Sequence, residues 1–505
     1  MASGDRPQED GAGEVQPAPF NLQSEAGQLR ARLVAHLVRE GVIRSPQLEE
    51  AFAAVPREFF LPGDIPLKKV YTDDAIVVKW DEQNQPTSSS TQPLLMADML
   101  EALRLEPGQR VLEIGAGVGY NAAIMAYVLG DGACLTTVDL DPGMAEISRQ
   151  NLERLAQYLG PSFGRVQVVA GDGSKGYDAN APYDRIIVTV QQWEISPAWV
   201  EQLKVGGLLL LPLTISRHLW GGLIPAFQKL SNGHLQAIAA SHGGFMPMRG
   251  SMAHPVNLPH SEQGRLMELP LDPEEVLPGL EINEVLQDAG VPTRLFLSGP
   301  DFSPELINFF ETADPPQVFA YDSYELDLSA NAVQLAGSQA QRAAAQAYAG
   351  YSVALAVALH DRLYPMILVL PTLEQDGLQG MPGDPASVRI EDGWRYETRG
   401  LALLAERPGQ VDLAAITANP PERRNWNKLA QGWQFAEQGK IPEPGQNRAM
   451  QKLLEAWQAW QQMGRPTPLD YRPLAYPRSE PPPAAGLVLE RANYNLLLPF
   501  QESAG

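Results

Sequence analysis

Cysteine is nearly absent from the chain, which has one, Cys134, among 505 residues. A single thiol forms no internal disulfide and supplies no cysteine-based zinc site. Basic residues are also few: 38 lysines and arginines stand against 60 aspartates and glutamates, a formal net charge of −22. Because nucleic-acid binding requires a basic surface, this balance predicts no nucleic-acid partner. The longest apolar run, residues 353–359, is far below the roughly 20 residues that span a bilayer, so we expect no membrane partner.

The first 25 residues lack the basic start and apolar core of a signal peptide, and their polar composition predicts a disordered tail. We therefore expect a cytoplasmic protein. The spacings between His234, His242, His254 and His260 fit no helical ligand pair, so we expect no metal site. A chain of 505 residues exceeds one ordinary core, which predicts two folded domains.

The most informative segment is VLEIGAGVGY, residues 111–120. An apolar strand ends at Glu113 and turns through Gly115 and Gly117 into a helix, which brings backbone N–H groups close to a ligand. Asp139 follows about twenty residues on, at the end of the next apolar run, where a carboxylate suits a ribose diol. The carboxylate of Glu113, just before the first glycine, would repel a pyrophosphate and suits a ligand with an ammonium and a sulfonium. No Gly-Lys-Ser/Thr is present, which argues against ATP hydrolysis.

Strands and helices alternate along the residues that follow. We expect helices at 121–129 and 143–159 and strands at 133–139, 166–170, 185–190 and 208–213. This alternation predicts an α/β fold with a doubly wound parallel sheet, in which the last of these runs is buried on both faces. Ligands of such sheets bind at the carboxyl ends of the strands, where Glu113, Asp139 and Asp172 fall.

The character of the sequence changes near residue 250, where Pro-rich spacers begin and no further chemical motif stands out. We therefore expect a tail at 1–25, a first domain at 26–250 and a C-terminal accessory domain at 251–505. The accessory domain is expected to be α+β and to serve substrate or partner recognition. It should contain an alanine-rich helix at 339–361 and, after a Pro-rich linker, a last strand at 487–489.

The first 250 residues carry a series of motifs that resembles, in order and spacing, the protein-L-isoaspartate O-methyltransferases. The motifs are LVAHLVREGVI, VPREFFLP, YTDDA, TQPLLMADML, EIGAGVGY, GDGSKG, APYDRIIVT and QLKVGGLLLLP. The resemblance implies a Rossmann-like methyltransferase fold with S-adenosyl-L-methionine (SAM) as cofactor, here fused to an extra C-terminal domain.

The resemblance also implies roles for individual residues in cofactor binding. The methionine part of SAM falls to residues of the glycine-rich turn, the ribose to Asp139, and the adenine edge to Asp172. The chemistry agrees, since a carboxylate accepts two hydroxyl hydrogen bonds from a ribose and Asp172 can accept from an exocyclic amine. The full expected set is Glu113, Gly115, Gly117, Tyr120, Asp139, Leu140, Asp172 and Gly173.

On the substrate side, the family's Ser-Gln-Pro turn corresponds to Thr91-Gln92-Pro93, which retains a hydroxyl. The nucleophile in such a reaction is a substrate carboxylate, already ionised at neutral pH, so no strong base is needed. A hydroxyl beside it can hold one carboxylate oxygen in line with the sulfonium. We assign the catalytic role to Thr91, with Ser90 as its substitute, and substrate binding to Gln92, Val190 and Gln191.

We expect a carboxyl methyltransferase that esterifies aspartyl or isoaspartyl side chains of proteins or peptides, so that a succinimide forms and isoaspartate is repaired. Two departures from the family leave alternatives open: the bulky wall at residues 190–193, and the C-terminal domain. One alternative is a dedicated tailoring enzyme that forms an aspartimide or isoaspartate in a ribosomally made peptide. The other is a non-catalytic SAM-binding scaffold. The oligomeric state is left open.

Overall fold

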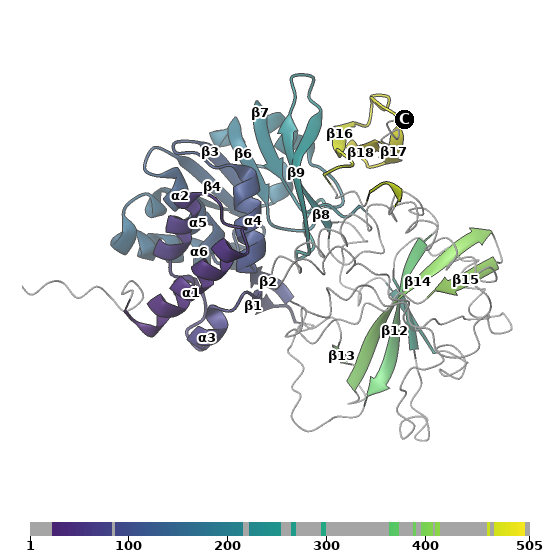
Figure 1. Cartoon of the computed structure of the whole chain (residues 1–505), viewed down its shortest axis with the longest axis horizontal. Coiled ribbons are helices and arrows are strands. Elements are labelled where there is room, and N and C mark those ends of the chain that lie inside the picture. The colour runs from purple at the N-terminus through teal and green to yellow at the C-terminus, as the bar shows by residue number, and fades with distance from the viewer. Residues whose placement is uncertain are drawn as a thin grey trace, which may run out of the picture.

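The computed structural model describes part of the chain, and every structural statement below concerns that part (Figure 1). The described residues are 23–82, 86–215, 222–253, 264–268, 294–298, 363–372, 387–389, 395–407, 410–414, 462–464 and 469–499. The predicted tail lies outside them as far as residue 22. Ser24 already caps a helix, because its Oγ accepts a hydrogen bond from the Gly27 N–H at 3.1 Å.

The N-terminal helices precede the main sheet and supply one of its covering layers. Leu33, Val34 and Leu37 lie on the buried side of the first helix, which gives it the apolar stripe expected of a helix packed on a core. A two-stranded antiparallel ribbon interrupts the series and leads into the last helix before the sheet. The elements are α1 (Glu25–Arg39), α2 (Pro46–Ala54), a 3₁₀ turn (Arg57–Phe60), α3 (Leu67–Val70), β1 (Ile76–Trp80), β2 (Pro86–Ser90) and α4 (Pro93–Leu103).

The predicted doubly wound sheet is present, with its parallel strands in the order β7-β6-β3-β4-β5. The strands begin and end within a few residues of their predicted limits. The one exception is the last strand, which begins at Leu203 and not at residue 208. The elements are β3 (Arg110–Ile114), α5 (Tyr120–Leu129), β4 (Cys134–Asp139), α6 (Pro142–Leu159), β5 (Gln167–Ala170), β6 (Tyr183–Val188), α7 (Pro197–Gln202) and β7 (Leu203–Leu210).

Hydrophobic clusters cover both faces of this sheet. Leu208 and Leu210 belong to the cluster shared with the N-terminal helices and α5, whereas Leu209 belongs to the cluster that contains Trp199. Successive residues of β7 therefore bury their side chains on opposite faces, as the apolar run predicts. Full burial of a leucine contributes about 1.5–3 kcal/mol, so this strand strongly stabilises the sheet.

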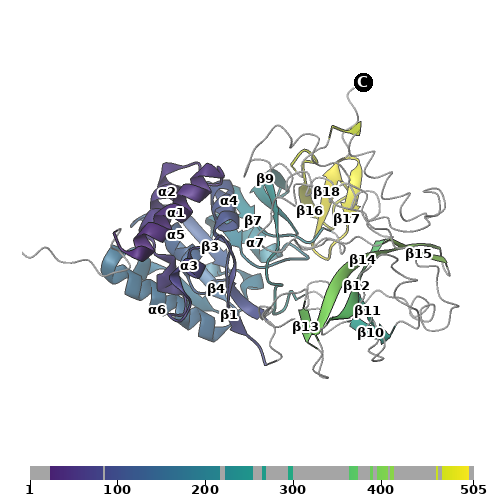
Figure 2. The same ribbon diagram turned by 60° about the horizontal axis from the view of Figure 1, so that its bottom comes forward.

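The sheet continues beyond β7 through five antiparallel strands, and three of them come from residues 474–499. Strands β8 (Gly222–Lys229) and β9 (Leu235–Gly243) follow β7, and β9 pairs with β16 (Leu474–Pro477). Strands β18 (Tyr494–Pro499) and β17 (Gly486–Leu489) complete a ten-stranded sheet. Figure 2 shows the three C-terminal strands in yellow beside β9.

This C-terminal ribbon, residues 469–499, corrects two expectations. Its residues were grouped with the accessory domain, and the strand at 487–489 was expected to be the last, whereas β18 follows it. The physical reason is that an edge strand such as β9 exposes unpaired N–H and C=O groups, which any compatible strand can satisfy. Pairing across more than two hundred residues leaves no local mark in the sequence.

A second, six-stranded antiparallel sheet lies within the stretch between β9 and β16 in the sequence. The apolar run at 366–370 forms part of its central strand β12, and the helix predicted at 339–361 lies outside the described residues. No helix in the described part of the chain is long and apolar enough to cross a bilayer. The strands are β10 (Gly264–Glu268), β11 (Arg294–Ser298), β12 (Leu363–Thr372), β13 (Ser387–Arg389), β14 (Arg395–Arg407) and β15 (Gln410–Ala414).

Candidate functional site

The glycine-rich turn leaves β3 at the carboxyl edge of the parallel sheet. Gly115, Gly117 and Gly119 all have positive φ angles, of 103°, 52° and 89°. A Cβ on Gly115 would lie 2.4 Å from Thr189 Oγ1, so a side chain there would collide with the residue after β6. The turn therefore needs glycine for its backbone angles and, at Gly115, for space as well.

Asp139 lies at the end of β4 and faces the turn. Its Oδ2 accepts a hydrogen bond from the Gly117 N–H, and its Oδ1 accepts one from the Asp141 N–H, both at 2.9 Å. Burial raises the pKa of this carboxyl, against the lowering effect of those backbone donors. The cap of the next helix is Asp141, whose Oδ1 accepts from Gly143 and Met144. Asp139 is thus left with acceptor capacity toward the cavity.

Glu113 is fully buried at the end of β3. Its Oε1 accepts from Asn121 Nδ2 at 2.7 Å, and its Oε2 accepts from Thr137 Oγ1 at 2.6 Å. Burial raises the pKa of the Glu113 carboxyl to about 7. These bonds fix the amide of Asn121, whose Oδ1 is buried and has no hydrogen-bond partner among the described residues. The Glu113 carboxylate thereby orients the Asn121 Oδ1, which is free to accept a hydrogen bond from a ligand.

One cavity joins the turn to the β1–β2 ribbon. It contains about 950 Å³ of empty space, including open solvent at its mouth. The buried Thr87 Oγ1 and Asn121 Oδ1 both belong to lining residues and lack a partner within the described chain. Two such atoms favour a polar ligand, because an unpaired buried acceptor costs about 1–3 kcal/mol. The lining also includes Ser88, Ser89, Ser90, Thr91, Gly115, Ala116, Gly117, Tyr120, Asp139, Leu140, Gly173, Thr189 and Val190.

Residues 245–251, here called the strap, close the cavity from the side of β9. Phe245, Met246, Pro247, Met248 and Arg249 all line it. Each end of the strap is fastened to a loop that follows a parallel strand. Backbone hydrogen bonds join the strap to residue 191 after β6, and its last residue bonds the loop after β5.

Asp172, after β5, is the partner of the strap's last residue. Its carboxylate accepts four hydrogen bonds, from the N–H and Oγ of Ser174 and from the N–H and Oγ of Ser251. Although burial opposes the shift, these donors lower the pKa of Asp172 to about 2. A carboxylate offers about four acceptor positions, so the strap and Ser174 occupy all of them.

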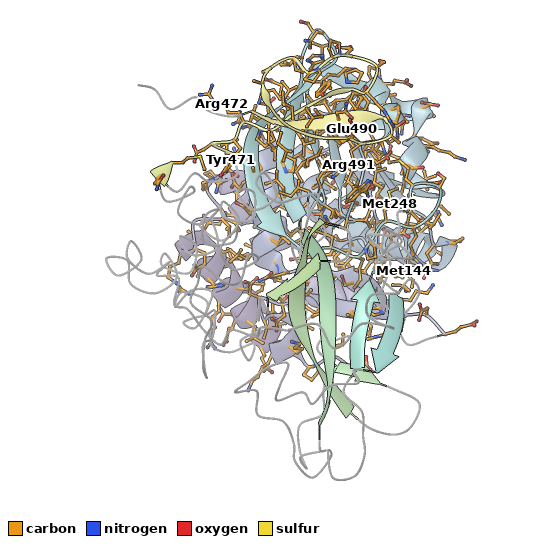
Figure 3. All side chains as sticks on the ribbon, turned by 90° about the vertical axis from the view of Figure 1, so that its right-hand side faces the viewer. Met144, Met248, Tyr471, Arg472, Glu490 and Arg491 are labelled. Carbon is orange, nitrogen blue, oxygen red and sulfur yellow. The ribbon has the colours of Figure 1, made fainter. Side chains whose placement is uncertain are left out.

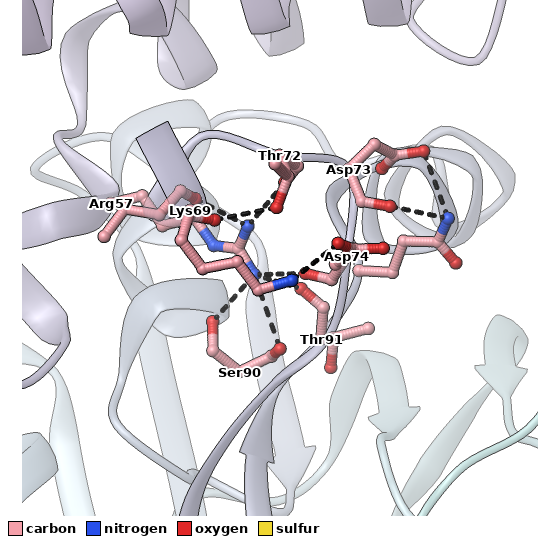
Figure 4. Close-up of polar contacts among 9 residues, drawn as sticks. Arg57, Lys69, Thr72, Asp73, Asp74, Ser90 and Thr91 are labelled. Atoms are coloured by element: carbon pink, nitrogen blue, oxygen red, sulfur yellow. Dashed lines mark hydrogen bonds and ion pairs between the residues drawn. The ribbon is translucent and has the colours of Figure 1, made fainter. Parts of the chain in front are cut away.

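The Ser90–Thr91 segment is fixed by a fully buried arginine, Arg57 (Figure 4). Its Nη1 donates to the carbonyl oxygens of Val70 and Thr72 at 3.0 and 3.2 Å. Its Nη2 donates to the carbonyl oxygens of residues 74, 90 and 91 at 2.9, 3.4 and 3.0 Å. Burial lowers the pKa of Arg57. One guanidinium thus fixes the loop after α3 to the end of β2.

The geometry distinguishes the two predicted catalytic hydroxyls. Ser90 is buried, and its Oγ lies 3.5 Å from Arg57 Nη2 as an acceptor. Both residues line the cavity, and Thr91 accepts its hydrogen bond from Arg57 at the backbone carbonyl. The Thr91 hydroxyl is therefore the better placed of the two to contact a substrate.

Comparison with known proteins agrees with the motifs. Residues 28–252 match the family model described as protein-L-isoaspartate(D-aspartate) O-methyltransferase. The protein-L-isoaspartate O-methyltransferase of Hyperthermus butylicus is 40% identical over 204 residues, 39% of this chain and 80% of that protein. The chain belongs to this family. The enzyme of that name from Thermococcus sibiricus is 39% identical over 221 residues, 43% of this chain and 92% of that protein. A solved structure of that name is 34% identical, with a TM-score of 0.39, and covers 44% of this chain and 67% of its own.

In this member of the isoaspartate O-methyltransferase family, most of the predicted site residues line the cavity. The others lie behind the lining. Glu113 and Asp172 are occupied by partners from the protein itself. Gln92 Nε2 donates to both the backbone oxygen and Oδ2 of Asp73 at 3.1 Å. Gln191 Nε2 donates to Thr214 Oγ1 at 3.0 Å. These two amides hold loops of the site and do not line the cavity.

Reasoning from the sequence missed Arg57, Asn121 and the strap. Arg57 stands inside the VPREFFLP motif that helped carry the resemblance, but arginine is seldom fully buried, so nothing marked it as an organising residue. Asn121 follows the glycine turn directly, where its polarity at the start of an apolar helix was an available signal. The strap carries no chemical motif and gains its role only by lying across the loops after β5 and β6.

Proposed function

We propose that this protein is a SAM-dependent carboxyl methyltransferase that esterifies isoaspartyl side chains of proteins or peptides. Family membership supports this activity, since two relatives bearing that name are matched over most of their length at about 40% identity. The observation that carries it is the joining, in one cavity, of the glycine turn and Asp139 with the hydroxyl-bearing Thr91. A cofactor site and a carboxylate-binding hydroxyl are what methyl transfer to a carboxylate requires.

The residues present fit the cofactor. Asp139 retains acceptor capacity for ribose hydroxyls, and the orphaned Asn121 Oδ1 offers an acceptor for an ammonium. We assign the methionine part to Asn121 and the turn at Gly115 and Gly117, with Glu113 acting behind Asn121. When bound, SAM supplies an electrophilic methyl group on a sulfonium.

The adenine end is assigned to Gly173 and Leu140, which line the cavity. Asp172, expected from the sequence to accept the adenine amine, is bonded to Ser251 of the strap. Two roles remain for its carboxylate: it fixes the strap, or it releases Ser251 to take the amine. The two hydrogen bonds that Ser251 donates to Asp172 favour the first role.

Catalysis by the chain consists mainly of positioning. The substrate carboxylate is ionised at neutral pH and attacks without help from a base. The Thr91 hydroxyl donates to one carboxylate oxygen and leaves the other directed toward the methyl group, while Arg57 fixes the backbone that carries Thr91. Alignment of this kind supplies several kcal/mol of the barrier reduction.

The product is a methyl ester, which reacts further without the enzyme. The backbone nitrogen of the following residue attacks the ester carbonyl, loses its proton and expels methanol, so that a succinimide closes. Hydrolysis of the ring returns a fraction of normal aspartate, which is the repair. The substrate partner is therefore a protein or peptide with an isoaspartyl residue. The tailoring and scaffold alternatives are not favoured, because the relatives bear the name of the isoaspartate enzyme.

The test is transfer of labelled methyl from SAM to a short isoaspartyl peptide by the full chain, compared with the same peptide carrying normal aspartate. We expect labelling of the isoaspartyl peptide alone, with base-labile label that appears as methanol. Tight SAM binding without labelling of either peptide would contradict the proposal. The full chain is needed, because truncation near residue 250 would remove the C-terminal ribbon from the sheet.

A further inference from the structure

Residues 190–194, here called the wall segment, follow β6 and begin at the cavity lining, to which β2 also contributes. Val190 lines the cavity and would lie 3.5 Å from a Cβ on Gly115. Gln191 pairs with the strap through two backbone hydrogen bonds, its N–H to the Met246 oxygen at 2.8 Å and its oxygen to the Met248 N–H at 3.0 Å. The position of this wall segment therefore sets the position of the strap.

The wall segment is held from behind by residues that follow β7. Gln192 N–H donates to the Pro212 oxygen at 2.9 Å, and Thr214 N–H donates to the Gln192 oxygen at 2.8 Å. Gln192 itself is fully buried. Backbone hydrogen bonds thus join two loops at the carboxyl edge of the sheet into one layer.

Arg491 of the C-terminal ribbon contacts both loops of this layer. Its Nε donates to the Trp193 oxygen at 2.9 Å, and its Nη2 donates to the Thr214 oxygen at 3.1 Å. Its guanidinium also lies over the Trp193 ring, 3.7 Å from the centroid. Figure 3 places Arg491 beside the C-terminal strands, with Met248 of the strap below it. Trp193, expected to make the wall of the site bulkier, is instead the platform for this arginine.

The neighbours of Arg491 strengthen the same attachment. The carboxylate of Glu194 accepts from the Ala492 N–H at 2.9 Å and from Asn493 Nδ2 at 2.8 Å. Trp193 and Glu194 are therefore both hydrogen-bonded to a segment that lies about three hundred positions later in the chain. This segment lies outside the family match at 28–252. A guanidinium suits this task, since its planar fork bonds two carbonyls while its face stacks on an indole.

We propose that Arg491 is a positioning residue for the peptide side of the site, which sets the wall segment and, through Gln191, the strap. Arg491 does not line the cavity. The elements assigned to SAM are held by their own strands, since Asp139 bonds Gly117 and Glu113 bonds Asn121 without help from the ribbon. The strap's far end is also fixed independently by Ser251 on Asp172. Loss of Arg491 should therefore weaken peptide binding more than cofactor binding.

The experiment compares full-length variants of Arg491 with a control in the same ribbon. Arg491→Met keeps the length and removes the carbonyl bonds, Arg491→Lys keeps the charge and one bond, and Trp193→Leu removes the stacking platform. Glu480→Gln is the control, because Glu480 bonds His234 at 2.8 Å on the β8–β9 turn, away from the wall segment. Melting temperature, the SAM Kd, and KM and kcat for an isoaspartyl peptide are measured for each.

We expect Arg491→Met to raise the peptide KM about tenfold, with a SAM Kd within threefold of wild type and partial rescue by Arg491→Lys. Trp193→Leu should also raise the peptide KM, and it provides the test if Arg491→Met does not fold. A peptide KM within twofold of wild type in both variants would overturn the proposal. So would a Glu480→Gln variant that raises KM as much, because docking of the ribbon alone would then explain the effect. The inference rests on the proposed function, and absence of transfer by the wild-type chain would count against that function instead.

Discussion

The two sides of the cavity are built on different scales. The side assigned to the cofactor comes from one stretch of chain, in which the glycine turn follows β3 and Asp139 ends β4, and Gly117 and Asp139 bond directly across 22 positions. The peptide side is assembled from β2, Arg57, the wall segment, the strap and the C-terminal ribbon, with bonds that span up to 299 positions. The cofactor side is thus a local motif, whereas the peptide side is formed by segments that are distant in the sequence.

This difference separates two kinds of constraint. On the cofactor side, the crossover from one parallel strand to the next fixes where the site residues lie, so a few residues at set spacing are enough to predict it. The peptide side depends on arginines that bond backbone carbonyls, and such acceptors occur at every residue. Changes on the cofactor side should therefore abolish SAM binding, while changes on the peptide side should act on the substrate step.

The largest effect is expected for Gly115→Ala on the cofactor side. Gly160→Ala is its control: both glycines have positive φ, 103° and 116°, but a Cβ on Gly160 meets nothing within 4 Å. The control is destabilised only by backbone strain, which costs roughly 1–3 kcal/mol. Gly115→Ala is destabilised by a further amount of roughly 1–3 kcal/mol, because its Cβ collides with Thr189. We expect loss of SAM affinity by about 100-fold for Gly115→Ala alone. Equal urea midpoints and equal SAM Kd values for the two variants would contradict this account.

Asp139→Asn is expected to weaken SAM binding by about 10- to 100-fold, because hydrogen bonds to a charged group contribute roughly 1.5–3 kcal/mol. The amide nitrogen also cannot accept from Gly117 or Asp141. Asp141→Asn is the matched control, since Asp141 caps α6 and pairs with Lys79 outside the cavity. Calorimetric titration with SAM measures both. A similar loss of affinity in the two variants would show that Asp139 has no specific role.

Thr91→Val tests the peptide side and should lower kcat about tenfold while leaving the SAM Kd unchanged, because one hydrogen bond to the substrate carboxylate is lost. Thr91→Ser should restore the rate. Ser90→Ala should change it little, since Ser90 Oγ faces Arg57. Steady-state transfer to an isoaspartyl peptide provides the measurement. If Ser90→Ala lowers kcat more than Thr91→Val, the catalytic hydroxyl has been assigned to the wrong residue.

The smallest effect concerns the pH dependence of stability at Glu113. Burial raises its folded pKa to about 7, above the ordinary value of 4.5, so between these pH values the folded state binds more protons than the unfolded state. The contribution of this carboxyl is therefore most favourable below pH 4.5 and is lost as the pH rises toward 7. Glu113→Gln has no such titration. Its unfolding free energy relative to wild type should increase from pH 5 to pH 8, in urea titrations, by a few kcal/mol at most. A difference that stays constant across this range would show that Glu113 is ionised throughout.

Some residues of the site could be placed from the sequence, and others could not. Gly115, Gly117 and Asp139 were placed at the cavity from spacing alone, because β-strand and helix periods fix where they fall. Thr91 was selected by resemblance, and the structure separates it from Ser90 by the direction of one hydroxyl toward Arg57. Gln92 and Gln191 were expected to bind substrate but hold loops, because an amide's partner cannot be inferred from its own position.

In the sequence by itself, the series of motifs indicated the family by resemblance, and short-range spacing with the conformational needs of glycine predicted the parallel sheet and its ligand-binding edge. Only the tertiary structure decided that the end of the chain returns to the sheet beside β9, and that Arg57 and Arg491 fix the walls of the site. Edge pairing and bonds to backbone carbonyls are open to any segment that arrives, so the choice depends on packing of the whole chain and leaves no motif behind.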